Sequence, residues 1–122
     1  MRVEWSFPAR PEAVTTARQL VLEALPGLPR GTTEALALMV SELATNCVVH
    51  ARTNFQVRVF LNDHVRVEVT DSGPGEAEVR RPRAGQAHGR GLQTVDALAD
   101  EWGVEPSRVH SGKTVWFTVT AR

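Results

Sequence analysis

The chain has 122 residues, 14 of them basic and 14 acidic, so its formal net charge is zero. This length suits a single domain, residues 1–122, which can bury a core without disulfides or structural metals. Balanced charge argues against direct binding to nucleic acid or to a membrane surface, and a single cysteine with no long apolar segment predicts a cytoplasmic protein.

The sequence opens with a pattern that predicts a strand and then a helix. Residues 2–7 alternate, with Val3, Trp5 and Phe7 on the apolar side, and a proline ends the run. Pro11 stands where a helix can begin, and apolar residues recur at helical spacing until the next Pro-Gly pair. The apolar side of the strand could pair with a second copy of the chain or pack on the helix, and the pattern favours neither.

A second helix is predicted after a short loop. Thr32 or Thr33 is a suitable N-cap residue, with Glu34 near the positive end of the helix. We expect this helix to continue to about His50 or Ala51. Its apolar stripe comprises Leu36, Met39, Val40, Leu43 and Cys47.

Two alternating segments, residues 57–61 and 65–69, predict a β-hairpin whose register can be argued. A two-residue loop would set apolar residues opposite polar ones and so mix the two faces of the sheet. A three-residue loop, residues 62–64, instead pairs apolar residues with each other and sets Arg58 opposite Glu68, a favourable cross-strand pair. We therefore predict the three-residue loop.

The second half of the chain predicts a long loop, a helix and two strands. The segment from Asp71 to Gly91 is rich in glycine, proline and arginine and has no periodicity, which is typical of a functional lid. Residues 92–99 predict a short helix, and residues 102–104 and 115–119 predict two strands. The complete order predicts an α+β two-layer sandwich, in which a mixed, mostly antiparallel sheet carries its helices on one face.

Three polar residues lie on the second predicted helix at a spacing of four. Glu42, Asn46 and His50 therefore fall near one face, beside the apolar stripe rather than within it. A carboxylate and an amide aligned in this way could hold a metal ion or polarise a hydroxyl group. The same pattern is also typical of the solvated face of an ordinary amphipathic helix, and the spacing alone does not separate the two interpretations.

Glycine-containing turns stand at both ends of the long loop. Asp71-Ser72-Gly73-Pro74-Gly75 follows the hairpin, so its glycines could let the backbone approach a flat ligand while the carboxylate accepts hydrogen bonds. His88-Gly89-Arg90-Gly91-Leu92 precedes a helix, where exposed backbone N–H groups favour an anion. In isolation, an ordinary turn and a flexible basic loop are the simpler explanations. The loop between the two segments also contains Arg80, Arg81 and Arg83.

Other templates of catalytic and metal sites do not fit the sequence. Ser111-Gly112-Lys113-Thr114 looks like the tail of a P-loop, but the spacing needs a glycine where Ser107 stands, and a strand rather than a helix follows. The cysteine and the histidines lack the spacing of zinc ligands, and the sequence has no G-x-S-x-G motif.

Taken together and in order, these segments resemble the motifs of the GHKL (Bergerat-fold) ATPases. Residues 41–51, S-E-L-A-T-N-C-V-V-H-A, resemble the N-box helix of that superfamily. Asp71-x-Gly73-x-Gly75 matches the first glycine box, Gly89-x-Gly91-Leu92 the second, and Gly112-Lys113-Thr114 the short final one. The resemblance covers nearly the whole chain. The form of the N-box, the small size and the opening strand and helix look most like the stand-alone anti-sigma-factor serine kinases of the RsbW/SpoIIAB type.

The resemblance implies that the chain binds ATP and Mg²⁺, and it gives roles to individual residues. Asn46 would bind the Mg²⁺ that bridges the phosphates, and Glu42 would be the catalytic base toward a serine hydroxyl. Asp71 would accept a hydrogen bond from the adenine amino group, in a pocket lined by Gly75 and Thr114. The ATP-binding residues implied in this way are Asn46, His50, Asp71, Gly73, Gly75, His88, Gly89, Arg90, Gly91, Leu92 and Thr114.

Two further implications concern the loops. Residues 76–90, approximately, would form the ATP lid, and the arginines of this lid would contact the γ-phosphate or a partner protein. Lys113 departs from the Gly-Thr pair that many relatives have, and we interpret it as an insertion between Gly112 and Thr114.

The function that the resemblance implies is that of an ATP- and Mg²⁺-dependent protein serine kinase. Such a kinase acts as an anti-sigma factor, which binds a sigma factor and phosphorylates an antagonist protein, and the resemblance favours a homodimer. Two alternatives remain open. One is a nucleotide-binding regulatory interaction module without phosphotransfer, and the other is a detached ATP-binding piece of a histidine-kinase-like system.

Overall fold

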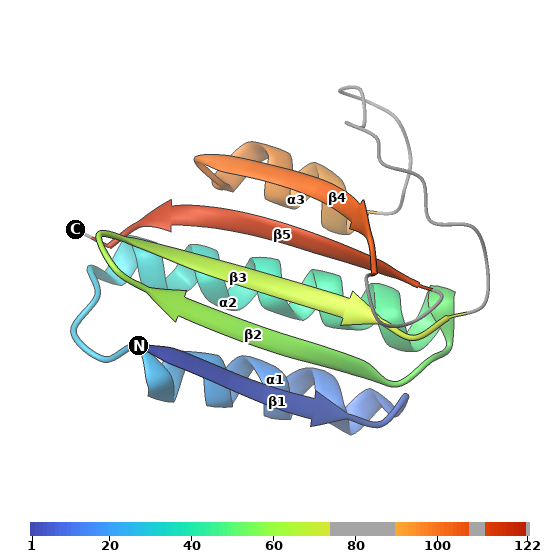
Figure 1. Ribbon diagram of the computed structural model, residues 1–122. Helices are drawn as coiled ribbons and strands as arrows, with labels where there is room; N and C mark the ends of the chain where they lie inside the picture. The colour runs from blue at the N-terminus through green and yellow to red at the C-terminus, as the bar shows by residue number, and fades with distance from the viewer. Residues whose placement is uncertain (74–89, 108–111, 122) are drawn as a thin grey trace.

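A computed structural model of the protein describes residues 1–73, 90–107 and 112–121 (Figure 1). The order of helices and strands predicted from the sequence is confirmed, and the last four strands are longer than predicted. In chain order the elements are β1 (Arg2–Phe7), α1 (Pro11–Ala24), α2 (Arg30–Thr45), the π-helical segment η1 (Asn46–Ala51), β2 (Phe55–Leu61), β3 (His64–Asp71), α3 (Arg90–Leu98), β4 (Glu101–Pro106) and β5 (Lys113–Thr120).

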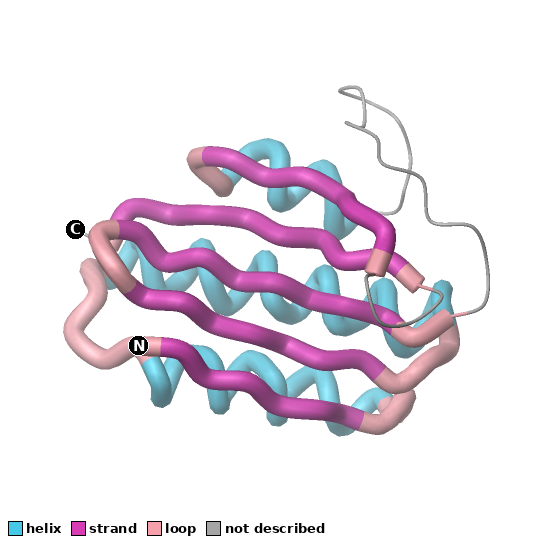
Figure 2. Tube along the Cα trace, viewed as in Figure 1, coloured by secondary structure: helices cyan, strands magenta, loops and turns pink. Residues whose placement is uncertain are grey.

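The strands form one five-stranded sheet in the order β1-β2-β3-β5-β4, and each pair of neighbours is antiparallel. Figure 2 shows the helices of the described residues together on one face of this sheet. The predicted fold class, an α+β two-layer sandwich with its helices on one face, is confirmed. The prediction allowed for some parallel pairing, whereas the strand pairs in the described residues are all antiparallel.

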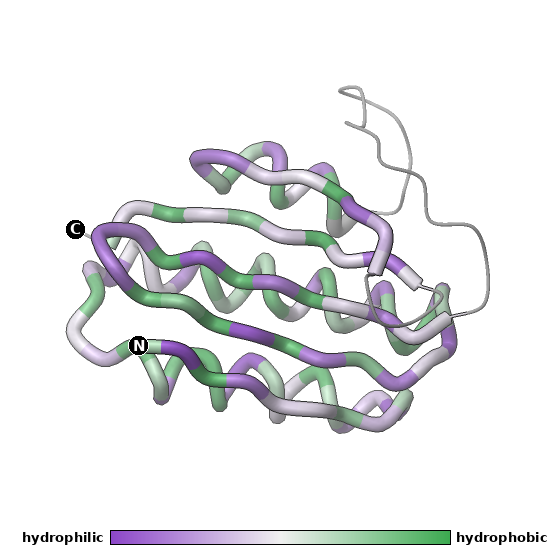
Figure 3. The backbone as a smooth tube through the Cα atoms, in the orientation of Figure 1, coloured by the Kyte–Doolittle hydropathy of each residue, from purple (hydrophilic) through white to green (hydrophobic). Residues whose placement is uncertain are grey.

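The core lies between the sheet and the helices, because each layer turns one apolar side toward the other. Along β2, and along β3 as far as Val69, buried residues alternate with half-buried or exposed ones, and Figure 3 shows the matching alternation of hydropathy. Burying one such valine or leucine contributes roughly 1.5–3 kcal/mol. The apolar stripe predicted for α2 and η1 is buried as expected, namely Leu36, Met39, Val40, Leu43 and Cys47.

The apolar side of β1 packs into this core. Phe7 is buried, and its ring stacks on the ring of Phe55 with the centroids 5.1 Å apart. Trp5 is partly buried against the same cluster. Trp5 and Phe7 therefore pack against the helical layer, and pairing of the edge strand β1 with a second copy of the chain stays a prediction.

The register of the β2–β3 hairpin is the one that the alternation predicts. Leu61 pairs with Val65, so three residues separate the last pair of the hairpin. His64 nevertheless belongs to β3, because it pairs with Thr120 on the neighbouring strand β5.

The start of α2 differs from the prediction. The helix begins at Arg30, with Pro29 as its N-cap residue and no capping hydrogen bond from a side chain. The backbone N–H of Thr33 donates to the carbonyl oxygen of Pro29 at 3.0 Å, so Thr33 already lies in the first turn. The prediction that Thr32 or Thr33 caps the helix is wrong, because the fixed φ of a proline directs the chain into the helix without a polar cap.

A row of alternating charges crosses the helix-free face of the sheet. Arg58 on β2 lies between Glu4 on β1 and Glu68 on β3, with N–O distances of 3.4 and 3.6 Å. Glu68 also pairs with Arg66 at 3.0 Å, and the Arg66 guanidinium lies 4.2 Å from the ring centroid of Trp116 on β5. Because these side chains are partly exposed, each ion pair contributes at most about 1 kcal/mol to stability.

Candidate functional site

The helix that carries the first motif changes its geometry at Asn46. The backbone is α-helical to Thr45 and π-helical from Asn46 to Ala51. Helical backbone as far as Ala51 is therefore confirmed, but its last six residues are not α-helical. In a π-turn each N–H bonds to the carbonyl five residues earlier, and such turns are frequent at functional sites.

Glu42 and Asn46 lie one α-helical turn apart, as their spacing predicts. The backbone N–H of Asn46 donates to the carbonyl oxygen of Glu42, and both residues are partly buried. His50 lies in the π-helical segment and is exposed, so the α-helical spacing that aligned it with the other two does not apply. The expected row of three is thus an aligned pair followed by a residue in a different kind of turn.

Asp71 ends β3 with a side chain that is only 6% exposed. Its Oδ1 atom accepts a hydrogen bond from the backbone N–H of Gly73 at 3.1 Å. Its Oδ2 atom accepts a hydrogen bond from Nζ of Lys113 at 3.0 Å. A buried carboxylate is unfavourable unless it is paired, so these two bonds fix the carboxylate in place and offset its desolvation.

Hydrogen bonds connect the end of β3 to the π-helical segment. The backbone N–H of Ser72 donates to the carbonyl oxygen of Asn54 and to Oγ1 of Thr53, each at 3.2 Å. The backbone N–H of Thr53 donates in turn to the carbonyl oxygen of Cys47, which lies in η1. The residue that follows Asp71 is therefore held by the segment that follows Asn46.

Gly112 lies against the backbone of Asp71. A Cβ atom at residue 112 would be 2.1 Å from the carbonyl oxygen of Asp71 and 2.7 Å from its Oδ1 atom. No side chain fits in this space, so a glycine is required for the last motif to approach the carboxylate. The carbonyl oxygen of Gly112 accepts a hydrogen bond from the N–H of Ser107 at 3.0 Å, which joins the ends of β4 and β5.

The register of β5 separates Lys113 from Thr114. Buried residues alternate from Val115 to Val119 and face the helices, so Lys113 lies on their side of the sheet. Thr114 lies on the other side, where its hydroxyl oxygen is 2.7 Å from that of Thr70. Lys113 is a regular residue of β5, and Lys113 rather than Thr114 bonds to Asp71. Its interpretation as an insertion relative to the family motif stays a prediction.

Cys47 is a buried neighbour of this ion pair. Burial raises the pKa of its thiol from the usual 9.0 to about 12, with a further upward contribution from the charge of Asp71 and an opposing one from Lys113. The thiolate is the reactive form of cysteine, so this thiol is unreactive at neutral pH.

We expect Cys47 to resist thiol reagents as long as the protein is folded. A thiol of pKa about 12 is ionised in only about one molecule in 10,000 at pH 8. A colorimetric disulfide reagent should therefore label the native protein far more slowly than the urea-unfolded protein. Equal labelling rates in the two states would contradict this expectation.

The same pKa shift predicts how stability depends on pH. The unfolded thiol ionises near 9.0 and the folded thiol near 12, so the free energy of unfolding should fall as the pH rises across this interval. Cys47→Ala should remove that part of the fall in urea unfolding curves measured at increasing pH.

Some predicted site residues lie outside the described residues, namely Gly75, His88 and Gly89, together with the lid up to residue 89 and its arginines. Arg90, which the prediction assigned to the lid, is the first residue of α3, followed by Gly91 and the buried Leu92. The N–H groups of a first helical turn have no acceptor in their own helix. Phosphate binding by Arg90, Gly91 and Leu92, as predicted from the sequence, requires such free backbone N–H groups.

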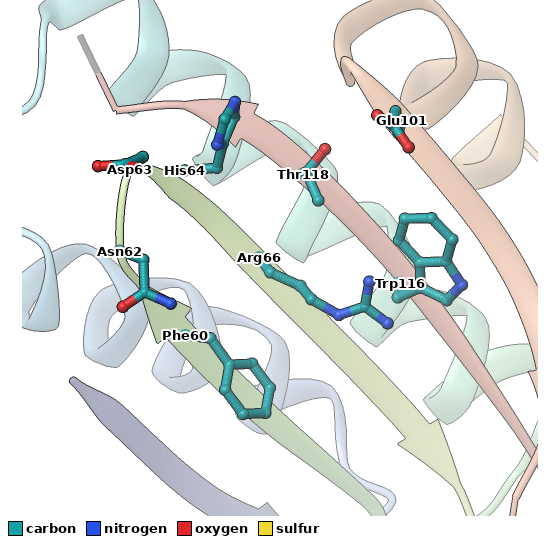
Figure 4. Close-up of a pocket in the computed structure, with 8 residues that line it drawn as sticks. All are labelled: Phe60, Asn62, Asp63, His64, Arg66, Glu101, Trp116 and Thr118. Atoms are coloured by element: carbon teal, nitrogen blue, oxygen red, sulfur yellow. The ribbon is translucent and has the colours of Figure 1, made fainter.

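A separate pocket opens on the helix-free face of the sheet (Figure 4). It contains none of the residues predicted for the site, and it lies on the opposite side of the sheet from Asp71 and Lys113. The pocket is lined by Phe60, Asn62, Asp63, His64, Arg66, Glu101, Trp116 and Thr118.

The surroundings of Asp71 fit the purine end of ATP. They provide a buried acceptor for an amino group, and the glycine at residue 112 adds no side chain of its own next to it. In the described residues no three His, Cys, Asp or Glu side chains gather as a metal site, so Mg²⁺ would need phosphate oxygens in addition to the amide of Asn46. No helix in residues 1–73, 90–107 or 112–121 has the length and apolar character needed to cross a membrane.

Comparison with known proteins identifies the domain. A model of the histidine kinase-like ATPase domain family matches residues 7–119, which is most of the chain. The search of curated proteins finds no match.

Proposed function

The chain belongs to the histidine kinase-like ATPase domain family, and from this premise we propose that it is an ATP- and Mg²⁺-dependent protein serine kinase that regulates a sigma factor. Family membership supports an ATP-binding regulatory role. The serine kinase activity and the sigma factor are the finer parts of the proposal. They rest on the form of the N-box around Glu42 and Asn46, which is similar to that of the RsbW/SpoIIAB-type kinases.

The buried carboxylate of Asp71 is the observation that carries ATP binding. Its oxygens are held by Gly73 and Lys113, and Gly112 packs against its backbone. A fixed carboxylate of this kind accepts a hydrogen bond from the exocyclic amino group of adenine, and its burial makes that bond strong. The bonds that link Ser72 to the segment after η1 support this proposal, because they hold the residue that follows Asp71 to the segment that follows the N-box helix.

In this proposal, residues of the helical layer bind the phosphates and the metal ion. Asn46 offers an amide oxygen at the junction of α2 and η1, and Mg²⁺ is suited to one such ligand plus phosphate oxygens and water. The first turn of α3 supplies backbone N–H groups to the phosphates.

Glu42 is the proposed base toward the serine hydroxyl. It lies one helical turn before Asn46, and in the described residues its carboxylate has no hydrogen-bond or ion-pair partner. Phosphoryl transfer depends on positioning and charge neutralisation more than on covalent chemistry by the protein. A carboxylate one turn from the metal ligand therefore suffices to orient a hydroxyl toward the γ-phosphate.

Calorimetric titration with ATP, with and without Mg²⁺, should separate the roles of Asp71 and Asn46. Asp71→Asn replaces an acceptor pair by an amide and removes the charge that pairs with Lys113, so ATP should bind about 10- to 100-fold more weakly in both conditions. Asn46→Ala should leave the metal-free affinity unchanged and remove most of the gain that Mg²⁺ gives.

Two exposed residues of the hairpin loop provide matched controls. Asp63→Asn and Asn62→Ala make the same chemical changes on the opposite side of the sheet, and neither should alter the titration. An Asp71→Asn variant that binds ATP as tightly as the wild type would overturn the proposed base site.

Transfer itself is tested with γ-phosphate-labelled ATP and candidate antagonist proteins. A serine kinase gives a label that survives acid and is lost in alkali, whereas a phosphohistidine is lost in acid. Acid-labile label would favour a histidine-kinase-like system. ATP binding without any labelled partner would favour a regulatory interaction module.

A further inference from the structure

Asp71 and Lys113 form a hydrogen-bond acceptor and a donor that lie side by side. Nζ of Lys113 is 3.0 Å from Oδ2 of Asp71, and both residues lie on the helix-facing side of the sheet. The Asp71 side chain is 6% exposed and the Lys113 side chain 46% exposed. The charged donor of the pair, Lys113, is therefore partly open to solvent, whereas the charged acceptor, Asp71, is buried.

We infer that Lys113 reads the base of the bound nucleotide together with Asp71, and so determines specificity for adenine. This inference rests on the proposed ATP binding and adds a residue to it. The edge of adenine carries an amino donor beside the ring acceptor N1. Asp71 accepts a hydrogen bond from the amino group and Lys113 donates one to N1. The two contacts together therefore favour a base that carries a donor beside an acceptor, as adenine does.

Both partners have hydrogen-bonding capacity for this contact. A carboxylate oxygen can accept more than one hydrogen bond, and an ammonium group has three donors. In the described residues each Asp71 oxygen accepts one bond, and Lys113 donates one. The base can therefore bind without breaking the ion pair, which keeps the buried carboxylate charged and paired.

The register of β5 fixes Lys113 in this position. The backbone of residue 113 pairs with Pro106 on β4, and Thr114 on the other side is bonded to Thr70 on β3. Gly112 packs closely against the carbonyl group of Asp71, and this contact opposes a change in the register of β5 relative to β3. The backbone of Lys113 is therefore held in place, and from this position its ammonium group reaches Oδ2 of Asp71.

The test compares ADP with 1-deaza-ADP, which lacks the N1 acceptor, by calorimetric titration without Mg²⁺. The wild-type protein should bind ADP about tenfold more tightly, as expected for a hydrogen bond from a charged donor. Lys113→Met keeps the length of the side chain and removes the donor, so it should bind the two nucleotides with equal affinity. Lys113→Arg keeps a charged donor and should restore part of the preference.

Each alternative role of Lys113 gives a different result. Tighter binding of ADP by Lys113→Met would mean that Lys113 competes with the base for Asp71, and it would overturn the inference. Equal losses for both nucleotides, with the tenfold preference intact, would mean that Lys113 only holds Asp71. A wild-type protein that binds both nucleotides equally overturns the role of Lys113 alone, whereas one that binds neither overturns ATP binding itself.

Discussion

Replacing Glu42 with alanine is expected to lower the rate of phosphate transfer by about 100- to 10,000-fold, the range typical of losing a general base. ATP binding should be unchanged, because the proposed contacts of the nucleotide come from Asp71, Asn46 and the first turn of α3. The carboxylate has no partner in the described part of the chain, so its removal leaves no buried group unpaired. The measurement is the initial rate of label transfer to the antagonist protein, with ATP affinity measured in parallel.

Glu34→Ala is the matched control for this experiment. Glu34 lies on the same helix, and within the described part of the chain its exposed carboxylate pairs with Arg30 alone, at 3.1 Å. This variant should transfer phosphate at the wild-type rate. If Glu42→Ala also kept the wild-type rate, Glu42 would not be the base, and another group would have to orient the serine hydroxyl.

Among glycine-to-alanine substitutions at the described glycines, Gly112→Ala should cause the largest loss of stability. The new Cβ atom would lie 2.1 Å from the carbonyl oxygen of Asp71, and the contacted atom is backbone, which cannot rotate away as a side chain can. Overpacking of this kind costs about 1–3 kcal/mol, and a backbone clash belongs at the upper end. Urea unfolding should therefore occur at a lower midpoint, and ATP should bind more weakly because Asp71 is displaced.

Gly31→Ala is the corresponding control. Gly31 lies in the first turn of α2, and a Cβ atom there meets nothing within 4 Å. Alanine is a better helix former than glycine, so this change should be neutral or stabilise the protein by up to about 1 kcal/mol. Equal stabilities for the two variants would contradict the close contact between Gly112 and Asp71.

Much of the fold was predictable because short-range patterns decide it. Alternation along residues 57–61 and 65–69 predicts both strands and their register, since a shift by one residue would turn valines to solvent. The start of α2 was less predictable. Thr32 and Thr33 are better N-cap residues than Pro29, and only the path of the chain into the helix decides between them.

The candidate site was predictable in its composition and less so in its geometry. The aligned pair Glu42 and Asn46 followed from helical spacing. The π-helical turn did not, because it depends on bonds to residues beyond the helix, such as the one from Thr53 to Cys47. The side of the sheet on which Lys113 lies was also predictable, since counting back from the buried residues Val115, Phe117 and Val119 assigns residue 113 to their face.

The row of charges on the helix-free face has a consequence for how the strands find each other during folding. In the native register Arg58 lies opposite Glu4 on one side and Glu68 on the other. A slip of two residues keeps the apolar face intact, but in one direction it brings Arg58 opposite Arg2 on β1 or Arg66 on β3, so that like charges meet. The row therefore makes misaligned pairing of the valine-rich strands unfavourable, although it adds little to the stability of the finished sheet.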